Sequence, residues 1–191
     1  MSRTTPSRKQ ATHDRIVEVA SRAIRRNGYG GAGVADVMKE AGLTHGGFYA
    51  HFESRDAMLA EAADRAGADT VAALAGIAAA VPPEQALTAL VQAYLSDAHL
   101  QRVESGCPLV ALASEMPRQS PEVRRAATRR IKELIDLVAR QSPDWGQPGA
   151  HPHALCTLST MVGALVLARA VDDPRLSSAV RDAAVQQLTR S

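Results

Sequence analysis

The segment from Gly33 to Arg55 constrains the fold of this chain more than any other part of the sequence. Apolar residues recur at helical spacing over its first half, which predicts a short helix that buries one face. Gly42 then stands where a left-handed residue commonly ends a helix. Thr44 offers a hydroxyl that can cap a second short helix. Two short helices joined by so tight a turn are typical of a helix-turn-helix motif.

The second helix of this segment has an unusual composition. It begins with Gly46 and Gly47, each of which costs a helix roughly 0.5–1 kcal/mol relative to alanine. A protein core does not need that pair, whereas a backbone that lies close against another surface does. Three side chains able to donate hydrogen bonds to phosphate oxygens follow, namely Tyr49, His51 and Arg55. An ordinary capped surface helix is the alternative interpretation.

At these residues the chain resembles the DNA-binding domain of the TetR family of transcriptional regulators. The resemblance runs from Thr12 to Leu59 and is carried by three pieces, RRNGYGG, AGLTHGGFYAHF and SRDAML. The chain departs from the family at Ala32 and Gly33, where members usually have a Ser or Thr that contacts phosphate. It departs again at His45, where a lysine is common.

The resemblance implies a homodimeric transcriptional regulator with double-stranded DNA as its partner. We expect a repressor that a small, largely apolar effector of unknown identity releases from a roughly palindromic operator. We expect base edges to face Thr44, His45, Gly46 and Gly47. Phosphates are expected to contact Tyr49, His51 and Arg55.

The distribution of charge supports a division into two parts. Residues 1–55 carry nine Lys/Arg against five Asp/Glu, whereas residues 56–191 carry thirteen against fifteen. A basic N-terminal piece suits a small reader of nucleic acid. We therefore expect a DNA-binding domain over 1–55 and a ligand-binding and dimerisation domain over 56–191. Arg3, Arg8 and Lys9 either follow a phosphate backbone or form a solvated tail.

The remainder of the chain predicts helices and no strands. Ser54 can cap a long helix that runs through Ile77. Prolines stand at or near the first turn of four later helices, expected to begin near residues 83, 108, 121 and 174. Segment 141–153 is rich in Pro and Gly, which predicts a loop. The expected fold is all-α, with an N-terminal three-helix helix-turn-helix domain and a C-terminal helical domain.

The last two helices carry broad apolar bands. Each band is wide enough to pack against its own domain on one side and against a second copy of the chain on the other. A monomeric core is the alternative interpretation. The predicted dimer interface consists of Leu155, Leu158, Met161, Val162, Leu165, Val180 and Ala184.

A mostly apolar ligand pocket is expected in the C-terminal domain. Its walls are expected to come from the long helix after Ser54 and from the helices over 83–103, after Cys107 and over 121–140. The candidate lining residues are Tyr94, His99, Cys107 and Met116. Cys107 stands at the start of a helix, where free N–H groups favour a thiolate, so a thiol sensor of electrophiles or oxidants is an alternative to an inert buried thiol.

Two other classes of protein fit the sequence less well. A small all-α thiol enzyme would use Cys107 with His99, but the segment from Gly33 to Arg55 would then have no explanation. An architectural helix-turn-helix protein has no use for a second, largely apolar domain. We therefore expect no enzymatic activity and no cofactor.

The cysteines and the apolar runs bear on metal binding and location. Cys107 and Cys156 make no disulfide framework, and no Cys/His spacing resembles a zinc site, so no metal is expected. The polar N-terminus is unlike a signal peptide, and the longest apolar runs, 71–81 and 161–168, are too short to span a bilayer. We expect a cytoplasmic protein without membrane association.

Overall fold

The computed structural model describes residues 7–190, and the regular structure within that range is entirely helical. In chain order the elements are α1 (Arg8–Gly31), α2 (Val34–Glu40), η1 (His45–Ala50), α3 (Arg55–Ala79), α4 (Pro83–Tyr94), α5 (Asp97–Gln101), α6 (Pro108–Leu112), η2 (Met116–Arg118), α7 (Pro121–Gln141), α8 (Ala150–Ala170) and α9 (Pro174–Leu188). The elements η1 and η2 are 3₁₀-helices. The prediction of an all-α fold is confirmed.

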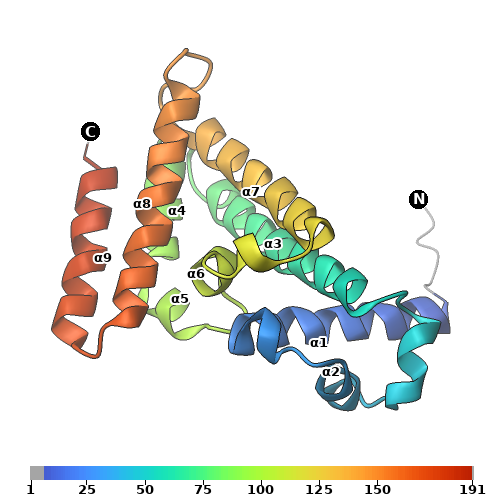
Figure 1. Ribbon diagram of the computed structural model, residues 1–191. Helices are drawn as coiled ribbons and strands as arrows, with labels where there is room; N and C mark the ends of the chain where they lie inside the picture. Colours follow the sequence, from blue (N-terminus) through green and yellow to red (C-terminus); the bar gives the residue numbers. More distant parts are fainter. Residues whose placement is uncertain (1–6, 191) are drawn as a thin grey trace.

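The helices form a triangular arrangement around α3 (Figure 1). The head, which consists of α1, α2 and η1, lies at the lower right of the view. From it α3 rises diagonally alongside α7, and the pair α8 and α9 stands on the side away from the recognition element. The long helix predicted after Ser54 therefore does connect the head to the rest of the molecule.

Local sequence explains where most helices begin. The Ser54 hydroxyl accepts a backbone N–H at 3.0 Å at the start of α3, and the Asp173 carboxylate accepts one at 2.8 Å at the start of α9. Prolines occupy the first turn of α4, α6, α7 and α9, as predicted. The helix expected over 83–103 is divided into α4 and α5, because the Ser96 hydroxyl caps a new helix by accepting a backbone N–H at 3.2 Å.

Two hydrophobic cores share α3. The first contains Ile16, Phe48 and Met58 of the head region together with Leu112 of α6 and Val123 of α7. The second is built from the C-terminal half of α3 with residues of α4, α7, α8 and α9. The head is therefore not an isolated unit, since α6 and α7 contribute side chains to its core.

The helix α8 is, within residues 7–190, the one helix long and apolar enough by length and composition to cross a membrane. Its 21 residues exceed the apolar run 161–168 on which the expectation of no such helix rested. One side of α8 packs in the second core, where Ala154 and Leu165 are fully buried. A helix that packs in a protein core passes the same test of length and composition.

Four residues of the predicted dimer interface lie inside the protomer instead. Leu158, Met161, Leu165 and Ala184 are buried, because α6, α7 and α9 pack around the inner side of α8. Their assignment to a surface between two copies is therefore wrong. Val162 and Val180 are half-buried, and Leu155 is exposed.

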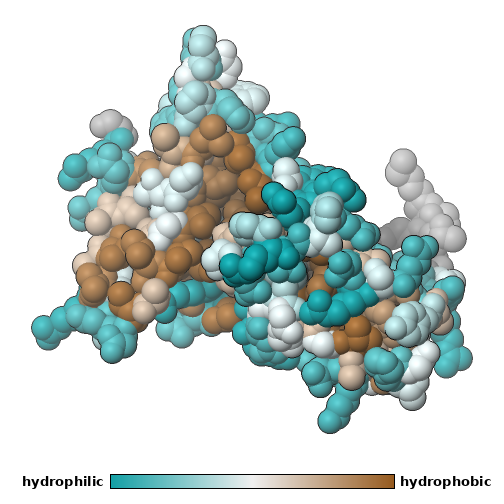
Figure 2. Space-filling view, in the orientation of Figure 1, coloured by the Kyte–Doolittle hydropathy of each residue, from teal (hydrophilic) through white to brown (hydrophobic). Residues whose placement is uncertain are grey.

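The outer side of α8 and the adjoining part of α9 nevertheless carry an apolar surface, which we call the α8–α9 face. Its large exposed members are Leu155, Val166, Leu167 and Leu176. Figure 2 shows hydrophobic residues gathered along α8, in contrast to the hydrophilic surface of α7. The apolar bands of the sequence thus predicted the correct helices but did not distinguish their inner and outer sides.

The kink near the end of α1 leads to a prediction about stability. Gly28 has φ +75°, and a Cβ there would collide with the Glu115 carboxylate, which accepts the Tyr29 N–H at 2.9 Å. The variant Gly28→Ala should lower the free energy of unfolding by about 2–4 kcal/mol, because left-handed strain adds to the loss of that hydrogen bond. Urea unfolding measures the change.

Gly42→Ala is the matched control for this measurement. Gly42 has φ +70°, but a Cβ there would meet only open space. The control should lose about 1–2 kcal/mol from backbone strain alone. Equal losses for the two variants would show that Glu115 does not constrain the kink.

Candidate nucleic-acid interface and effector cavity

A Schellman turn sets the angle between α2 and η1. The Gly42 N–H donates to the Lys39 carbonyl at 3.0 Å, and the Leu43 N–H donates to the Met38 carbonyl at 2.9 Å. These are the two hydrogen bonds that define this helix ending. The predicted turn at Gly42 is present.

The recognition element that follows the turn is the 3₁₀-helix η1 rather than the predicted α-helix. Thr44 occupies its N-cap position, but its hydroxyl makes no capping hydrogen bond within the described chain. The Thr44 carbonyl accepts the Gly47 N–H at 3.1 Å instead. Thr44 is exposed, so its hydroxyl is accessible to a binding partner.

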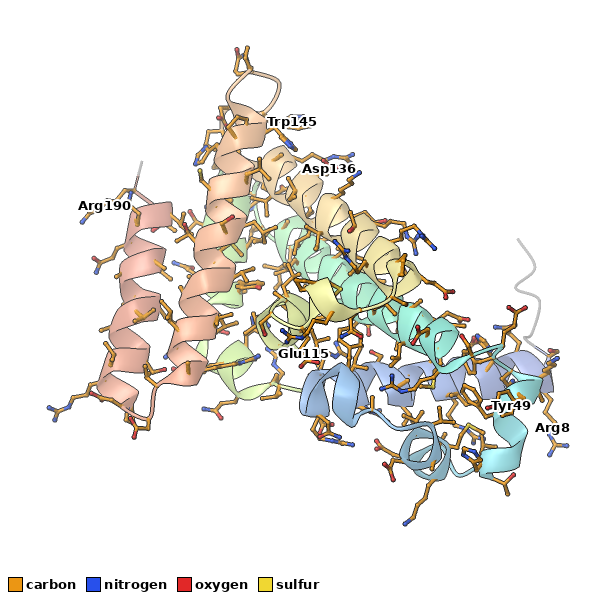
Figure 3. All side chains as sticks on the ribbon, in the orientation of Figure 1. Arg8, Tyr49, Glu115, Asp136, Trp145 and Arg190 are labelled. Atoms are coloured by element: carbon orange, nitrogen blue, oxygen red, sulfur yellow. The ribbon has the colours of Figure 1, made fainter. Side chains whose placement is uncertain are left out.

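Two phenylalanines hold the recognition element against the head. Phe48 and Phe52 are buried, and their rings stack with centroids 5.5 Å apart. The ring of His13 in α1 stacks on Phe52 at 4.5 Å. Tyr49 is the opposite case, since 74% of its surface is exposed, and Figure 3 shows it at the outer edge of the head with Arg8 nearby. Phe48 and Phe52 therefore anchor the recognition element inward, whereas Tyr49 faces outward.

Neither the backbone conformation nor the packing of residues 7–190 requires glycine at positions 46 and 47. Neither has a positive φ. A Cβ on Gly46 would meet nothing within 4 Å, and one on Gly47 would meet only ordinary contacts, the nearest at 3.7 Å from Met38. Since alanine would fit and would favour a helix more, no contact within residues 7–190 accounts for either glycine.

Arg55 has a different role from the predicted one. Its guanidinium donates to the backbone carbonyls of Tyr29 and Ala32 at the end of α1, and its side chain is half-buried. The structure therefore makes Arg55 a brace between α3 and the end of α1. This brace was missed because nothing local in the sequence pairs residue 55 with carbonyls more than twenty positions earlier.

The side chain of His51 is half-buried at the surface of the head. Its Nδ1 is buried and has no hydrogen-bond partner among the described residues. Burial lowers the pKa of His51 below its ordinary value, and the nearby His13 and Lys9 lower it further. His13 itself is hydrogen-bonded to Glu61, with Nε2 and Oε2 2.7 Å apart. Of the predicted basic arm, Arg8 and Lys9 lie in the first turn of α1, and Arg3 lies outside the described residues.

The lowered pKa of His51 leads to a prediction about pH. In the unbound protein the lowered pKa leaves His51 mostly neutral near pH 7, whereas a neighbouring phosphate favours the charged form. DNA binding should therefore take up a proton, and affinity should rise as the pH falls from about 7.5 toward 6. Fluorescence anisotropy on a duplex selected from random sequences measures this dependence.

The control variants for the pH measurement are His51→Gln and His153→Gln. The first should flatten the dependence, while the second, in the first turn of α8, should leave it unchanged. The depressed pKa also means that His51 stabilises the fold above its ordinary pKa and loses that contribution as the pH falls, so the folded fraction must be followed in parallel. An unchanged pH dependence in His51→Gln would remove His51 from the phosphate contacts.

The glycine pair leads to a prediction that separates folding from recognition. Gly46→Ala should leave the free energy of unfolding unchanged or raise it by up to about 1 kcal/mol, because the site is open and φ is negative. DNA affinity should fall about tenfold or more, since a Cβ prevents close approach of the backbone. Gly76→Ala in α3, which is equally open, should share the stability effect without changing DNA affinity. Unchanged DNA affinity in Gly46→Ala would place the DNA elsewhere.

An apolar cavity lies between α3, α6 and α7. Its volume is about 30 Å³, and its lining includes Tyr29, Cys107, Met116 and Leu134. Of the predicted pocket residues, Cys107 and Met116 line this cavity. The presence of Tyr29, a residue of α1, was not predicted. The only sequence signal for Tyr29 was its place in the RRNGYGG piece.

A second cavity of about 160 Å³ lies between α3, α4 and the segment around α5. Tyr94, His99 and Cys107 line it, so the predicted pocket residues are divided between two cavities that Cys107 separates. The lining of the second cavity is more polar, with Asp69 and Arg102 among its members. The predicted walls are thus present, but the α4 wall belongs to the second cavity.

Of the two alternatives for Cys107, the structure fits the inert buried thiol better than the thiolate. Its side chain is 2% exposed, and burial raises the pKa of its thiol, which outweighs any effect of the five-residue helix α6. His99 is fixed by two hydrogen bonds: its Nδ1–H donates to the Tyr94 carbonyl at 2.6 Å, and its Nε2 accepts the Cys107 backbone N–H at 3.0 Å. Because both imidazole nitrogens are occupied, His99 cannot serve as a base for the thiol, and the thiol-enzyme arrangement is not formed.

Three polar contacts join the head to the segment that lines both cavities, residues 104–116. The buried Arg25 guanidinium donates to the Gly106 carbonyl at 3.3 Å. Arg26 pairs with Glu104 at 3.2 Å, and Glu115 accepts the Tyr29 N–H. Figure 3 shows Glu115 where this segment meets α1. The fold and the exposed recognition element together define a helix-turn-helix DNA-binding protein with a cavity-bearing second domain.

Comparison with known families gives the same class. The model for bacterial regulatory proteins of the tetR family matches residues 16–62, and the model for the C-terminal domain of LmrA/YxaF-like transcriptional regulators matches residues 83–182. The second match spans more than half of the 191 residues. The chain therefore belongs to the TetR family, as the sequence resemblance predicted, and it is a DNA-binding transcriptional regulator. Both matched domains are those of a regulator rather than an enzyme.

Solved structures show the same fold. E. coli NemR in its reduced form has a TM-score of 0.80 and 19% identity over 94% of this chain and 95% of that one. A TetR regulator from Chloroflexus aurantiacus has a TM-score of 0.78 and 25% identity over 96% of each chain. A TetR-family regulator from Agrobacterium tumefaciens has a TM-score of 0.78 and 21% identity over 95% of this chain and 100% of that one. Among curated proteins none matches the chain.

Proposed function

We propose that this protein is a cytoplasmic homodimeric repressor, released from a roughly palindromic operator by a small, largely apolar molecule. Residues 1–55 form the DNA-binding head, and residues 56–191 form the ligand-binding and dimerisation domain. The boundary falls at the start of α3, whose N-terminal half also contributes to the core of the head.

The proposed DNA contacts follow from exposure on the recognition element. Thr44, His45 and Gly46 are exposed beside Gly47, which suits contacts to base edges. Tyr49 is the exposed donor best placed for a phosphate, and the half-buried His51 is the second candidate. Arg55 is left out of this set, because its guanidinium is engaged by carbonyls of the head.

The α8–α9 face is the observation that carries the proposed assembly. Leu167 is 57% exposed and Leu176 is 48% exposed, and no part of residues 7–190 covers this face. A second copy that packs α8 and α9 against the same helices buries the face around a twofold axis. Two recognition elements related by that axis suit an operator with two half-sites.

The position of segment 104–116 supports release by a ligand. This one segment lines both cavities and bonds to α1 through Gly106, Glu104 and Glu115. A ligand that displaces the segment therefore changes its contacts with α1. Release requires such a ligand to bind the displaced state more tightly than the state that binds the operator.

A non-covalent ligand is favoured over the thiol sensor. A reactive cysteine is accessible and has a depressed pKa, whereas Cys107 is buried and the pKa of its thiol is raised. Cys156 is exposed on α8 and is not among the residues that line either cavity. The proposed effector therefore binds without forming a bond to sulfur.

The proposed dimer predicts the effect of a charge on the α8–α9 face. Leu167→Glu should leave the protomer folded, because the side chain is exposed, but should raise the dimer dissociation constant about 100-fold or more by burying a carboxylate. Sedimentation should show monomers, and operator binding should be lost with the dimer. Ala72→Glu, on an exposed position of α3, is the control and should change neither. A Leu167→Glu protein that remains dimeric would move the interface elsewhere.

A further inference from the structure

We propose that the effector is a neutral, mostly apolar molecule that carries a hydrogen-bond acceptor such as a carbonyl oxygen, and that Tyr29 of the DNA-binding head donates a hydrogen bond to it. This inference rests on the proposed release by a ligand. It adds the chemical class of that ligand and a binding residue that belongs to the head.

The Tyr29 hydroxyl is a buried donor without a partner. The side chain is 1% exposed, and its hydroxyl has no hydrogen bond to any residue of 7–190. Burial, with the nearby Glu115 carboxylate, raises the pKa of Tyr29, so the hydroxyl keeps its proton and remains a donor. A buried hydroxyl without a partner is costly, and an acceptor that enters the adjoining cavity relieves that cost.

The cavity beside Tyr29 selects against charge. Its lining is apolar apart from Tyr29, Thr70 and Arg130. The Thr70 hydroxyl donates to the Ala66 carbonyl at 3.1 Å, so that proton is already used. The Arg130 guanidinium contacts both carboxylate oxygens of Asp64, at 2.8 and 2.6 Å, and a carboxylate oxygen of Glu133 at 2.7 Å. The one cation of the lining is therefore neutralised, and an anionic ligand gains no partner there.

The cavity must open to admit such a ligand. At about 30 Å³ it holds no more than a water molecule or two. The second cavity, of about 160 Å³, shares Thr70 and Cys107 with it. Movement of Cys107 with the short helix α6 would therefore join the two spaces into a larger one.

The main chain of Tyr29 links this contact to the recognition element. Its N–H is held by Glu115 at 2.9 Å, and its carbonyl accepts a hydrogen bond from Arg55, the first residue of α3. Arg55 follows the anchor Phe52 by three positions. A ligand on the Tyr29 hydroxyl therefore contacts the residue at which the cavity segment, α1 and the start of α3 meet.

Tyr94 offers the matched alternative, because its hydroxyl is also buried without a well-formed hydrogen bond among the described residues. It lines the second cavity, whose walls include Asp69, His99 and Arg102. Those polar groups suit water more than an apolar molecule. The apolar surroundings of Tyr29 are the reason for choosing it over Tyr94.

Three probes of equal size test the proposal by calorimetry with the full-length protein. Acetophenone carries a carbonyl, 2-phenylpropene replaces that oxygen with CH₂, and benzoate carries a negative charge. Wild-type protein should bind acetophenone about tenfold more tightly than 2-phenylpropene, and should bind benzoate most weakly. The ratio of the first two affinities should fall to about one in Tyr29→Phe and stay about tenfold in Tyr94→Phe.

Other outcomes overturn the proposal in distinguishable ways. If 2-phenylpropene binds as tightly as acetophenone, or if Tyr94→Phe rather than Tyr29→Phe removes the preference, the role of Tyr29 fails while an apolar effector cavity stands. Tighter binding of benzoate refutes the neutral class. If none of the three binds to any of the proteins, the Tyr29 contact and the neutral, acceptor-bearing class of effector are wrong, while the proposed release by a ligand of another class stands.

Discussion

The continuous helix α3 is the constraint on which the rest of the structure depends. It belongs to both hydrophobic cores, with Met58 and Leu59 in the first and Leu74 in the second. Because α3 packs in both cores, a displacement of α3 within one core is a displacement within the other as well. The packing of α7 along α3 reinforces this coupling, as the ion pairs of Asp64 with Arg129 and Arg130 show. The proposed release by a ligand would use this shared packing to connect the cavity between these helices to the head.

A second constraint comes from the buried Arg25. Burial lowers the pKa of its guanidinium, which shows that the charged form is costly there. Its donors are satisfied by the carbonyl and hydroxyl of Ser21 in the same helix and by the Gly106 carbonyl of the cavity segment. Removal of that last acceptor would leave part of a buried charge unpaired. Arg25 thus holds segment 104–116 in one position and makes any alternative position of the segment a distinct state rather than a small adjustment.

The sequence predicted those features that depend on neighbours along the chain. The turn at Gly42, the cap at Ser54 and the prolines in first turns are all local, and all are present. The features it did not predict depend on distant partners. In the sequence Arg55 looks like a surface donor, but in the fold its guanidinium binds a carbonyl at the end of α1. The helix α8 is apolar on all sides, so its periodicity could not distinguish the side that packs in the core from the exposed side. The sequence likewise left open whether Cys107 is a thiolate or an inert buried thiol, because burial depends on distant partners.

The small volume of the cavity beside Tyr29 determines which state of the protein a ligand can favour. A ligand shifts an equilibrium only by binding one state better than another, and the state described here has about 30 Å³ beside Tyr29. A ligand of drug-like size must therefore favour a state in which the segment around Cys107 has moved. That segment is hydrogen-bonded to Arg25, Arg26 and Tyr29 of α1. Its movement therefore either breaks these hydrogen bonds or moves the end of α1 with it. If a ligand releases the protein as proposed, the arrangement with the small cavity is the one that suits the operator, and a bound ligand would oppose it because that cavity is too small to hold the ligand.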